Sequence, residues 1–310
     1  MLTGVSASAE SWDMPVAYGD STYHTATAKE FAQCVGTATG GELDITVHSG
    51  GSLLAGDKIK ASVSKGIVNI GERLLSAHQD ENPVFGIDSV PFLAASFEES
   101  EELRQVSDPI LNAFLEKQNL HLLYSVPWPP QGLFTDREVD SIADLKGTRF
   151  RSYNQATARL ATLTGMQPVR VAAAELDAAL DSGAAQSFIS SAATGYGRGV
   201  WQHLSHYYAV DAWLPRNHVF VNLEVWTGLM DSTRNALNAC AQMAQYAGYY
   251  RAREYTELTM SALRDEGMSV MEPSGVFRAQ LLELGEQMSA EWLSGAGPDA
   301  KSVVDAYLSQ

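Results

Sequence analysis

The sequence has 310 residues, enough for two domains or one large one. Hydrophobic residues make up 45% and charged residues 19%, a globular balance that excludes a disordered or fibrous chain. The formal net charge of −16 argues against nucleic acid and anionic membrane surfaces as partners, because both would repel the chain. The sequence has no apolar run long enough to predict a membrane-spanning helix.

The first residues, MLTGVSASAESWDMP, contain a small-x-small pattern at Ala7-Ser8-Ala9, the form that signal peptidase prefers. The basic and apolar parts of a signal peptide do not precede it. We interpret the chain as an exported protein whose signal peptide has been removed, with Met1 added for expression. The alternative is a plain flexible N-terminus.

The first part of the chain alternates strands and helices. In LDITVHS the residues Leu43, Ile45 and Val47 share one face, as in a half-buried strand. The predicted order is strand MPVAYG (14–19), helix 21–35, strand LDITVHS (43–49), helix 57–66, strand IVNIGE (67–72), helix 98–118 and strand LHLLYSV (120–126).

A second run follows DLKG (144–147). It predicts strand TRFRSY (148–153), helix 154–164, strand QPVRV (167–171), helix 173–183 and strand AQSFISS (185–191). We expect residues 201–226 to be extended. From Asp231 nearly everything is helical, and one pattern runs for about 35 residues without an internal cap.

Strands separated by helices predict an α/β fold with a parallel or mixed sheet. The two runs, before and after residue 136, predict two lobes with a cleft between them, and the long helix would span both. We expect lobe I to contain residues 12–136 and 218–258, and lobe II residues 137–217 and 259–310.

The two cysteines, Cys34 and Cys240, lie in helix-like segments and lack the spacing of a metal site. They are either buried free thiols or a disulfide between two helices in an oxidising compartment. His203 and His206 are three residues apart, but no carboxylate or cysteine stands close to them in sequence. We therefore predict no metal and no cofactor.

Motifs for catalysis are missing as well. The sequence has no glycine-rich phosphate loop, no G-x-S-x-G and no His-Glu-x-x-His. We predict no catalytic residue, and the chemistry indicated is binding.

The segment DLKGTRFRSYNQATARL indicates what is bound. Arg151 ends a predicted strand just before a helix that opens near Tyr153 and Asn154. Ligands of α/β folds gather at such strand ends, and an arginine beside helix N–H donors suits a carboxylate. The alternative is a surface arginine paired with Asp144 or Glu175.

Other polar and aromatic residues fall at comparable strand ends, and together they predict one ligand site with Arg151. Each of them taken singly also fits a core or loop position. The full set of predicted ligand-binding residues is Arg151, Glu72, Trp128, Gln131, Tyr153, Asn154, Phe188, Ser190, Ser191 and Trp213.

The chain resembles the substrate-binding proteins of tripartite ATP-independent periplasmic (TRAP) transporters, in the family of the C4-dicarboxylate-binding protein. The resemblance runs from Tyr18 to about Glu291. It rests on the order and spacing of soft motifs: TGGELDITVHSGGSL, VPFL (90–93), DLKGTRFR with Arg151 in the family's arginine position, GMQPVRVAAAELDAALDSG and WQHLSHYY.

The resemblance implies a two-lobed, periplasmic receptor, a monomer that closes on an organic acid and delivers it to membrane permease subunits. Arg151 would form the salt bridge to the ligand. Ser190 stands where the family has asparagine, and Gln131-Gly132 where many relatives have a second arginine. These departures argue against a dicarboxylate or sialic acid and favour a monocarboxylate, aromatic or a hydroxy or keto acid.

Two alternatives come from other classes of protein. An enzyme on a similar scaffold would need a positioned nucleophile and base or a metal, and the sequence indicates neither. The binding protein of an ATP-driven importer differs mainly in its partner.

Overall fold

The computed structural model describes residues 10–309. Ala7-Ser8-Ala9 lies outside the described residues, so its interpretation stays a prediction. A search of residues 10–309 finds no helix with the length and apolar character that crossing a bilayer requires. The described chain divides into two compact units. Unit 1 contains the residues up to Arg73 with Asn112–Val126 and Asn217–Tyr250, and unit 2 contains the rest.

Unit 1 combines short helices with two small sheets. Its helices are α1 (Tyr23–Ala38), α2 (Gly56–Ser64) and α7 (Leu223–Gly228), together with the first part of α8 (Asp231–Asp265) and the end of α3 (Phe97–Glu116). Strands β1 (Glu10–Pro15) and β2 (Leu43–His48) form a parallel pair, and β3 (Ile70–Leu74), β10 (Arg216–Asn222) and β4 (Leu120–Pro127) form a sheet with β10 in the centre.

The first strand lies earlier than predicted. MPVAYG was expected to be extended, but β1 is Glu10–Pro15 and pairs with all six residues of β2. The reason is the pattern of side chains. Trp12 and Met14 are buried while Ser11 and Asp13 are exposed, so the period of two already begins before Met14.

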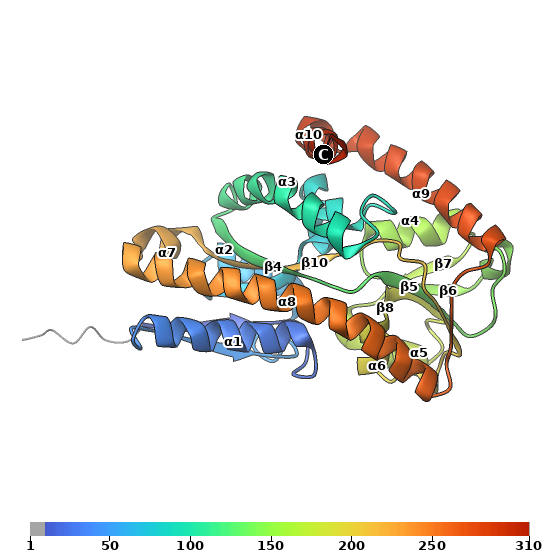
Figure 1. Ribbon diagram of the computed structural model, residues 1–310, viewed down its shortest axis with the longest axis horizontal. Helices are drawn as coiled ribbons and strands as arrows, with labels where there is room; N and C mark the ends of the chain where they lie inside the picture. The colour runs from blue at the N-terminus through green and yellow to red at the C-terminus, as the bar shows by residue number, and fades with distance from the viewer. Residues whose placement is uncertain (1–9, 310) are drawn as a thin grey trace, which may run out of the picture. The chain divides into compact units, whose positions relative to one another are not determined.

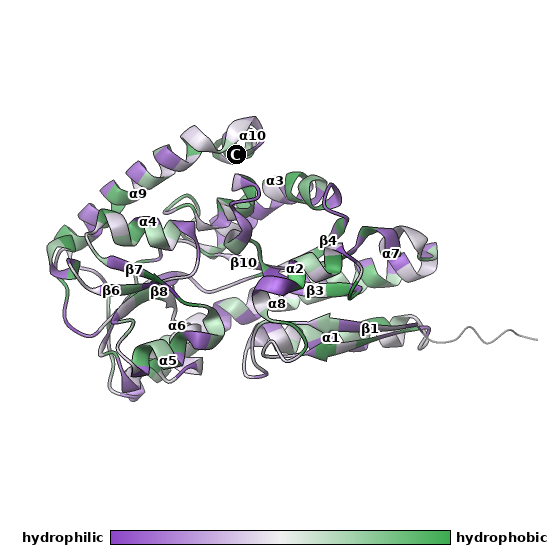
Figure 2. Ribbon diagram, turned by 180° about the vertical axis from the view of Figure 1, so that it is seen from behind, coloured by the Kyte–Doolittle hydropathy of each residue, from purple (hydrophilic) through white to green (hydrophobic). Residues whose placement is uncertain are grey.

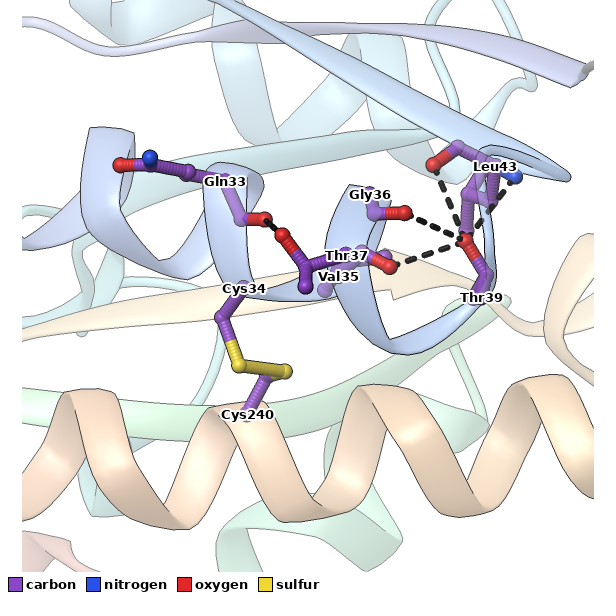
Figure 3. The surroundings of a disulfide bond; sticks show 8 residues. All are labelled: Gln33, Cys34, Val35, Gly36, Thr37, Thr39, Leu43 and Cys240. Atoms are coloured by element: carbon purple, nitrogen blue, oxygen red, sulfur yellow. Dashed lines mark hydrogen bonds between the residues drawn. A yellow bond between two sulfur atoms is a disulfide. The ribbon is translucent and has the colours of Figure 1, made fainter.

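A disulfide joins Cys34 of α1 to Cys240 of α8, as Figure 3 shows. Their Cα atoms are 5.8 Å apart, and the two residues are separated by 206 positions in sequence. This settles the alternative that the sequence left open. The hydroxyl of Thr39 donates to the carbonyl of Val35 at 2.9 Å and accepts from the amide of Leu43 at 3.2 Å, which joins the end of α1 to the start of β2.

Unit 2 is built on a six-stranded mixed sheet with the order β11-β9-β5-β8-β6-β7. Strand β5 runs antiparallel to β8 and β9, whereas β6 runs parallel to β7 and β8, and β11 to β9. The strands are β5 (Gln131–Thr135), β6 (Arg149–Ser152), β7 (Gln167–Arg170), β8 (Ser187–Ser191), β9 (His206–Tyr208) and β11 (Ser269–Met271).

The helices of unit 2 are α4 (Gln155–Leu163), α5 (Leu176–Asp181), α6 (Ala192–Gly197), α9 (Gly275–Gly295) and α10 (Gly297–Leu308), with most of α3 and the second part of α8. Helices α4 and α9 pack against one face of the sheet, and α5, α6 and α8 against the other. Helices α3 and α10 pack together in a separate apolar cluster. Helix α9 alternates hydrophilic and hydrophobic residues along its length, as Figure 2 shows, and buries Phe277, Leu281 and Met288. The strand–helix alternation predicted after residue 147 is confirmed.

The sheet of unit 2 has an apolar core on each face. Neighbouring residues of one strand belong to different clusters: Leu133 and Ile189 lie in one, Phe134 and Phe188 in the other. This separation follows from the period of two, which points successive side chains to opposite faces. Helices on both faces allow both sets to be buried.

The long helical pattern is also confirmed, since α8 is one helix of 35 residues, drawn unbroken in Figure 1. The expectation that 201–226 is wholly extended is wrong in part. Residues Leu223–Gly228 form α7, because the side chain of Asn222 accepts a hydrogen bond from the amide of Val225 at 3.1 Å and begins a helix there.

The predicted lobe boundaries differ from those of the compact units. Residues 74–111, 127–136 and 251–258 were expected in lobe I, and they pack within unit 2. Compact units need not coincide with the bodies that move about a hinge, so the lobe boundaries stay a prediction.

Candidate functional site

Arg151 lies where the sequence analysis expected it, near the end of β6 and just before α4. Only 5% of the residue is exposed. Its Nε donates to the carbonyl of Val171 at 3.0 Å, and its guanidinium carbon lies 4.9 Å from the centre of the Tyr153 ring. A planar cation stacked on an aromatic ring has a fixed orientation, which suits the recognition of a carboxylate.

Asn154 begins α4. Its Oδ1 accepts from the amide of Thr157 at 2.9 Å, and the hydroxyl of Thr157 accepts from the amide of Asn154 at 3.1 Å. This reciprocal cap stabilises the first turn of the helix. The Nδ2 of Asn154 also donates to the hydroxyl of Ser76 at 3.3 Å. These bonds explain an asparagine here by its structural role, and a contact with ligand stays a prediction.

Three of the predicted site residues form a hydrogen-bonded group, which we call the Tyr153 cluster: Tyr153, Trp213 and Gln131. The indole Nε1 of Trp213 donates to the hydroxyl of Tyr153 at 3.2 Å. The hydroxyl of Tyr153 lies 3.5 Å from the Oε1 of Gln131, to which it donates. The Nε2 of Gln131 donates to the carbonyl of Pro129 at 2.8 Å. This chain of contacts fixes the Tyr153 ring on which Arg151 lies.

The pairing of β5 with β8 places two serines beside this cluster. Gln131 is opposite Ser191, and Gly132 is opposite Ser190. A Cβ atom at Gly132 would meet the Tyr207 ring at 2.4 Å, so only glycine fits at this position. The hydroxyl of Ser191 accepts from the amide of Thr194 at 3.2 Å and caps α6. Ser190 keeps no structural role of that kind and stays a predicted ligand contact.

Phe188 is fully buried. Its ring stacks on Phe134 with centroids 4.6 Å apart, within the apolar core of the sheet. This placement favours a core role over a ligand wall. Trp128 is 7% exposed, and its amide donates to the carbonyl of Pro215 at 2.7 Å, so the backbone that carries the indole is fixed.

Glu72 is the one predicted site residue that belongs to unit 1. It lies inside β3, and its Oε1 accepts from the Nδ2 of Asn217 at 2.7 Å. Burial raises the pKa of the Glu72 carboxyl to about 7, and the hydrogen bond from Asn217 opposes the rise only in part. The carboxyl therefore titrates near neutral pH.

The sequence analysis missed a buried arginine with its own carboxylates in unit 2. Arg216 is 3% exposed, and its Nη2 donates to Glu101 at 3.2 Å and to the hydroxyl of Ser100 at 3.2 Å. Its amide donates to Asp88 at 2.8 Å. Burial raises the pKa of Asp88 to about 6. The sequence did contain a sign of this buried ion pair. An arginine that opens the apolar strand RNHVFVN has to be neutralised by carboxylates inside the fold.

Between residues 10 and 309, no group of histidine, cysteine, aspartate and glutamate side chains has the arrangement of a metal site. His203 instead lies 3.4 Å from the carboxylate of Asp181. The hydroxyl of Ser205 lies 2.8 Å from the Nδ1 of His206. The two histidines thus have separate partners.

The chain matches a family of known proteins. The sequence model of DctP, described as bacterial extracellular solute-binding protein, family 7, matches residues 16–294. A TRAP solute-binding protein from a marine metagenome, from an unidentified microbe, is 45% identical in sequence. The similarity covers 97% of this chain and 99% of that one with a TM-score of 0.95, and that protein is specific for pyroglutamate, with which it was co-purified.

Two extracytoplasmic solute receptors of Bordetella pertussis are similar over the same share of this chain. DctP6 is 36% and DctP7 is 38% identical, each over 97% of this chain and 100% of its own, and each with a TM-score of 0.95. Both of those receptors bind pyroglutamic acid.

Proposed function

Because the chain belongs to family 7 of the bacterial extracellular solute-binding proteins and is a solute receptor of a TRAP transporter, we propose that its ligand is pyroglutamate. The observation that carries the proposal is the 45% identity, over nearly the whole of both chains, to a receptor specific for that acid. The predicted fold class and receptor function are confirmed by the family match and the similar structures.

Pyroglutamate is a small cyclic monocarboxylate, as the sequence analysis favoured, but it is a lactam and not the aromatic, hydroxy or keto acid expected there. It carries one carboxylate on a five-membered ring together with an amide N–H and an amide carbonyl. A receptor for it needs one cation, a few directed hydrogen bonds and apolar surface for the ring methylenes. A second buried cation would leave its charge without a partner.

Arg151 is the group that we assign to the carboxylate. It lies one residue before the end of β6, which runs parallel to both of its neighbours, it is almost fully buried, and the amides of the first turn of α4 follow it. A guanidinium can bind both carboxylate oxygens at once, and burial strengthens that interaction because water does not screen it. The stacked Tyr153 ring holds the guanidinium before the ligand arrives, which reduces the entropic cost of binding.

Gln131 is the group that we assign to the amide of the ligand. An amide nitrogen has two N–H donors, and one of those of Gln131 is committed to Pro129 at 2.8 Å. The second can donate to the lactam carbonyl. The hydroxyl of Ser190, opposite Gly132 in the neighbouring strand, is both a donor and an acceptor and suits the lactam N–H. Glu72, Trp128 and Trp213 stay predicted ligand contacts.

The family also indicates where the protein works and what it does with its solute. We infer that the receptor works in the periplasm after removal of a signal peptide, binds its solute without chemical change and delivers it to the membrane permease of the transporter. The family description, bacterial extracellular solute-binding protein, supports the location outside the cytoplasm and the role in binding a solute.

Calorimetric titration tests the ligand. Pyroglutamate should bind with micromolar affinity or tighter, a free energy of about −8 kcal/mol or more. Proline lacks the lactam carbonyl and cyclopentanecarboxylate lacks the whole amide, so both should bind at least about tenfold more weakly. Glutamate, open and with a second carboxylate, should also bind weakly. Binding of glutamate or a uronic acid, with no response to pyroglutamate, would overturn the ligand and leave the family unchanged.

A further inference from the structure

One face of α8 is uncharged, although the chain carries a formal net charge of −16. The residues from Asn235 to Tyr250 include no aspartate, glutamate, lysine, arginine or histidine. The buried side of this part of the helix contains Leu237, Cys240, Ala241 and Ala244. The exposed side contains Asn235, Asn238, Ala239, Gln242, Met243, Tyr246 and Tyr250. We call these seven exposed residues the Tyr246 face.

Three large side chains of this face are exposed to solvent. Met243 is 65% exposed, Tyr246 66% and Tyr250 52%. The rings of Tyr246 and Tyr250 lie 4.5 Å apart and brace one another. Tyrosine and methionine are enriched in the cores of protein interfaces, and charged residues are depleted there. The composition of the Tyr246 face is therefore that of an interface and differs from the ordinary surface of an acidic protein.

The net charge of the chain indicates which molecule covers the Tyr246 face. Two copies of a chain with a net charge of −16 repel each other, and they can meet most easily where neither presents a charge. The Tyr246 face lies wholly on the part of α8 that belongs to unit 1, and the disulfide at Cys240 joins that part to α1. A helix held in this way is a preorganised docking surface.

The order of large and small residues indicates the same occupant. The face has small or polar residues toward its start, such as Asn235 and Ala239, and large ones toward its end. If two such helices cross antiparallel about a twofold axis next to Gln242, Tyr246 of one copy packs against Ala239 of the other. Tyr250 then packs against Asn235. Each large side chain meets a small one, which is the self-complementarity that an isologous interface requires.

We propose that the Tyr246 face is the interface of a homodimer in which α8 of one copy crosses α8 of a second copy antiparallel. The dimer would revise the monomer that the sequence analysis expected. It involves none of the residues assigned to pyroglutamate, so it does not depend on the proposed ligand.

Sedimentation equilibrium on the full chain tests the proposal over a concentration series from low micromolar to near millimolar. The wild-type chain should pass from monomer to dimer. Tyr246→Glu, which places two charges across the twofold axis, should weaken the dimer by at least about tenfold. Leu258→Glu is the matched control, because Leu258 is 57% exposed on the same helix outside this face, and it should leave the dimer unchanged. All three proteins should bind ligand alike.

A second variant locates the axis. Gln242→Cys should form a covalent dimer under mild oxidation, because the two copies of this position lie beside the axis. Val276→Cys, at a residue that is 64% exposed on α9, should not. A wild-type chain that stays monomeric throughout the series overturns the proposal, as does a dimer that Tyr246→Glu leaves intact. Loss of permease-dependent uptake in Tyr246→Glu, with a monomeric wild type, would overturn it in favour of a permease docking surface.

Discussion

Tyr153 and Tyr246 have the same side chain in opposite surroundings. The hydroxyl of Tyr153 accepts a hydrogen bond from Trp213 and donates to Gln131, and its ring supports Arg151. Tyr246 is 66% exposed, and its ring contacts Tyr250 one turn further along α8. The first ring is fixed by polar partners on several elements, and the second by one neighbour on its own helix.

The difference shows that burial determines how strongly the protein depends on the polar group of an aromatic residue. Inside the fold each polar atom needs a partner, so a change at one member of the Tyr153 cluster leaves another member unsatisfied. At the surface water replaces any partner that is lost. We therefore expect buried positions to respond strongly to substitution and exposed ones to respond only when another molecule covers them.

The largest effect on stability is expected at the buried side of α8. Replacing the disulfide by Cys34→Ser with Cys240→Ser should lower the free energy of unfolding by about 2–5 kcal/mol, because the bond closes a long loop in the unfolded chain. The separation of 206 residues favours the upper part of that range. Urea denaturation without reductant measures it.

The exposed side of the same helix supplies the control. Leu258→Ser, at a residue of α8 that is 57% exposed and lies outside the Tyr246 face, should leave the free energy of unfolding nearly unchanged. Wild-type protein in excess reductant should unfold like the double variant. A loss of less than about 1 kcal/mol would contradict the expectation.

Substitutions of Arg151 test whether Arg151 and the Tyr153 cluster form the ligand site. Arg151→Ala should weaken pyroglutamate binding by about 2–5 kcal/mol, the usual cost of removing one partner from a buried charge pair. Arg151→Lys should restore only part of this, because lysine lacks the planar fork of the guanidinium. Calorimetry measures both. Arg149→Ala, on an exposed residue of the same strand, should leave the affinity within about twofold. An Arg151→Ala protein within about threefold of wild type would refute the assignment.

Glu72 is a buried residue whose ionisation should make the stability of the protein depend on pH. Its pKa in the folded protein is raised to about 7 by burial, so the folded state holds its proton more tightly than the unfolded state does. The resulting stability is fully present below about pH 4.5 and is lost as the pH rises toward 7, with a total of about 3 kcal/mol.

Glu72→Gln should remove this decline, since the amide can keep the hydrogen bond with Asn217 and does not ionise. The free energies of unfolding of the two proteins, measured at pH 5 and pH 8, should differ mainly at pH 8, where the variant is the more stable. Glu42→Gln, at an exposed glutamate of the same unit, is the control. Parallel pH profiles for Glu72→Gln and wild type would show that the carboxyl does not titrate in this range.

The smallest expected effect on the free energy of unfolding comes from replacing Tyr153 or Tyr246 by phenylalanine. Tyr153→Phe leaves the indole N–H of Trp213 without its acceptor and should lower the free energy of unfolding by about 1–3 kcal/mol. Tyr246→Phe, measured at low micromolar protein where the chain is monomeric, should leave the free energy of unfolding unchanged within error, because water then solvates whatever the lost hydroxyl contacted. Thermal and urea denaturation of the pair provide the measurement, and equal losses for the two variants would show that burial is not the deciding factor.

Much of the fold could be read from periodicity. The 35-residue helix, the β6–α4 unit and the strand at Leu43–His48 follow patterns of 3.6 or two residues that depend only on neighbours in sequence. The order and spacing of soft motifs were enough to identify the family. Strand β5 was missed because QGLFT is buried on both faces and so lacks alternation.

The candidate site was predictable in part. The position of Arg151 between a strand and a helix is local, and the sequence located it. The roles of its neighbours are not local: Trp213 lies 60 residues from Tyr153 in the chain, and Asn217 lies 145 from Glu72. A hydrogen bond between such residues depends on the sheet order β5-β8-β6 and on the path of β10, which no short pattern determines.

The sequence alone therefore determined the class of protein, the long helix and the arginine at the mouth of α4, because each depends on residues close together in the chain. The tertiary structure decided the rest. It paired Cys34 with Cys240, placed Phe188 in the core and surrounded Arg216 with carboxylates. It also separated a partly buried tyrosine, Tyr153, from an exposed one, Tyr246. These outcomes depend on which surfaces remain in water after packing, and that is a property of the whole fold.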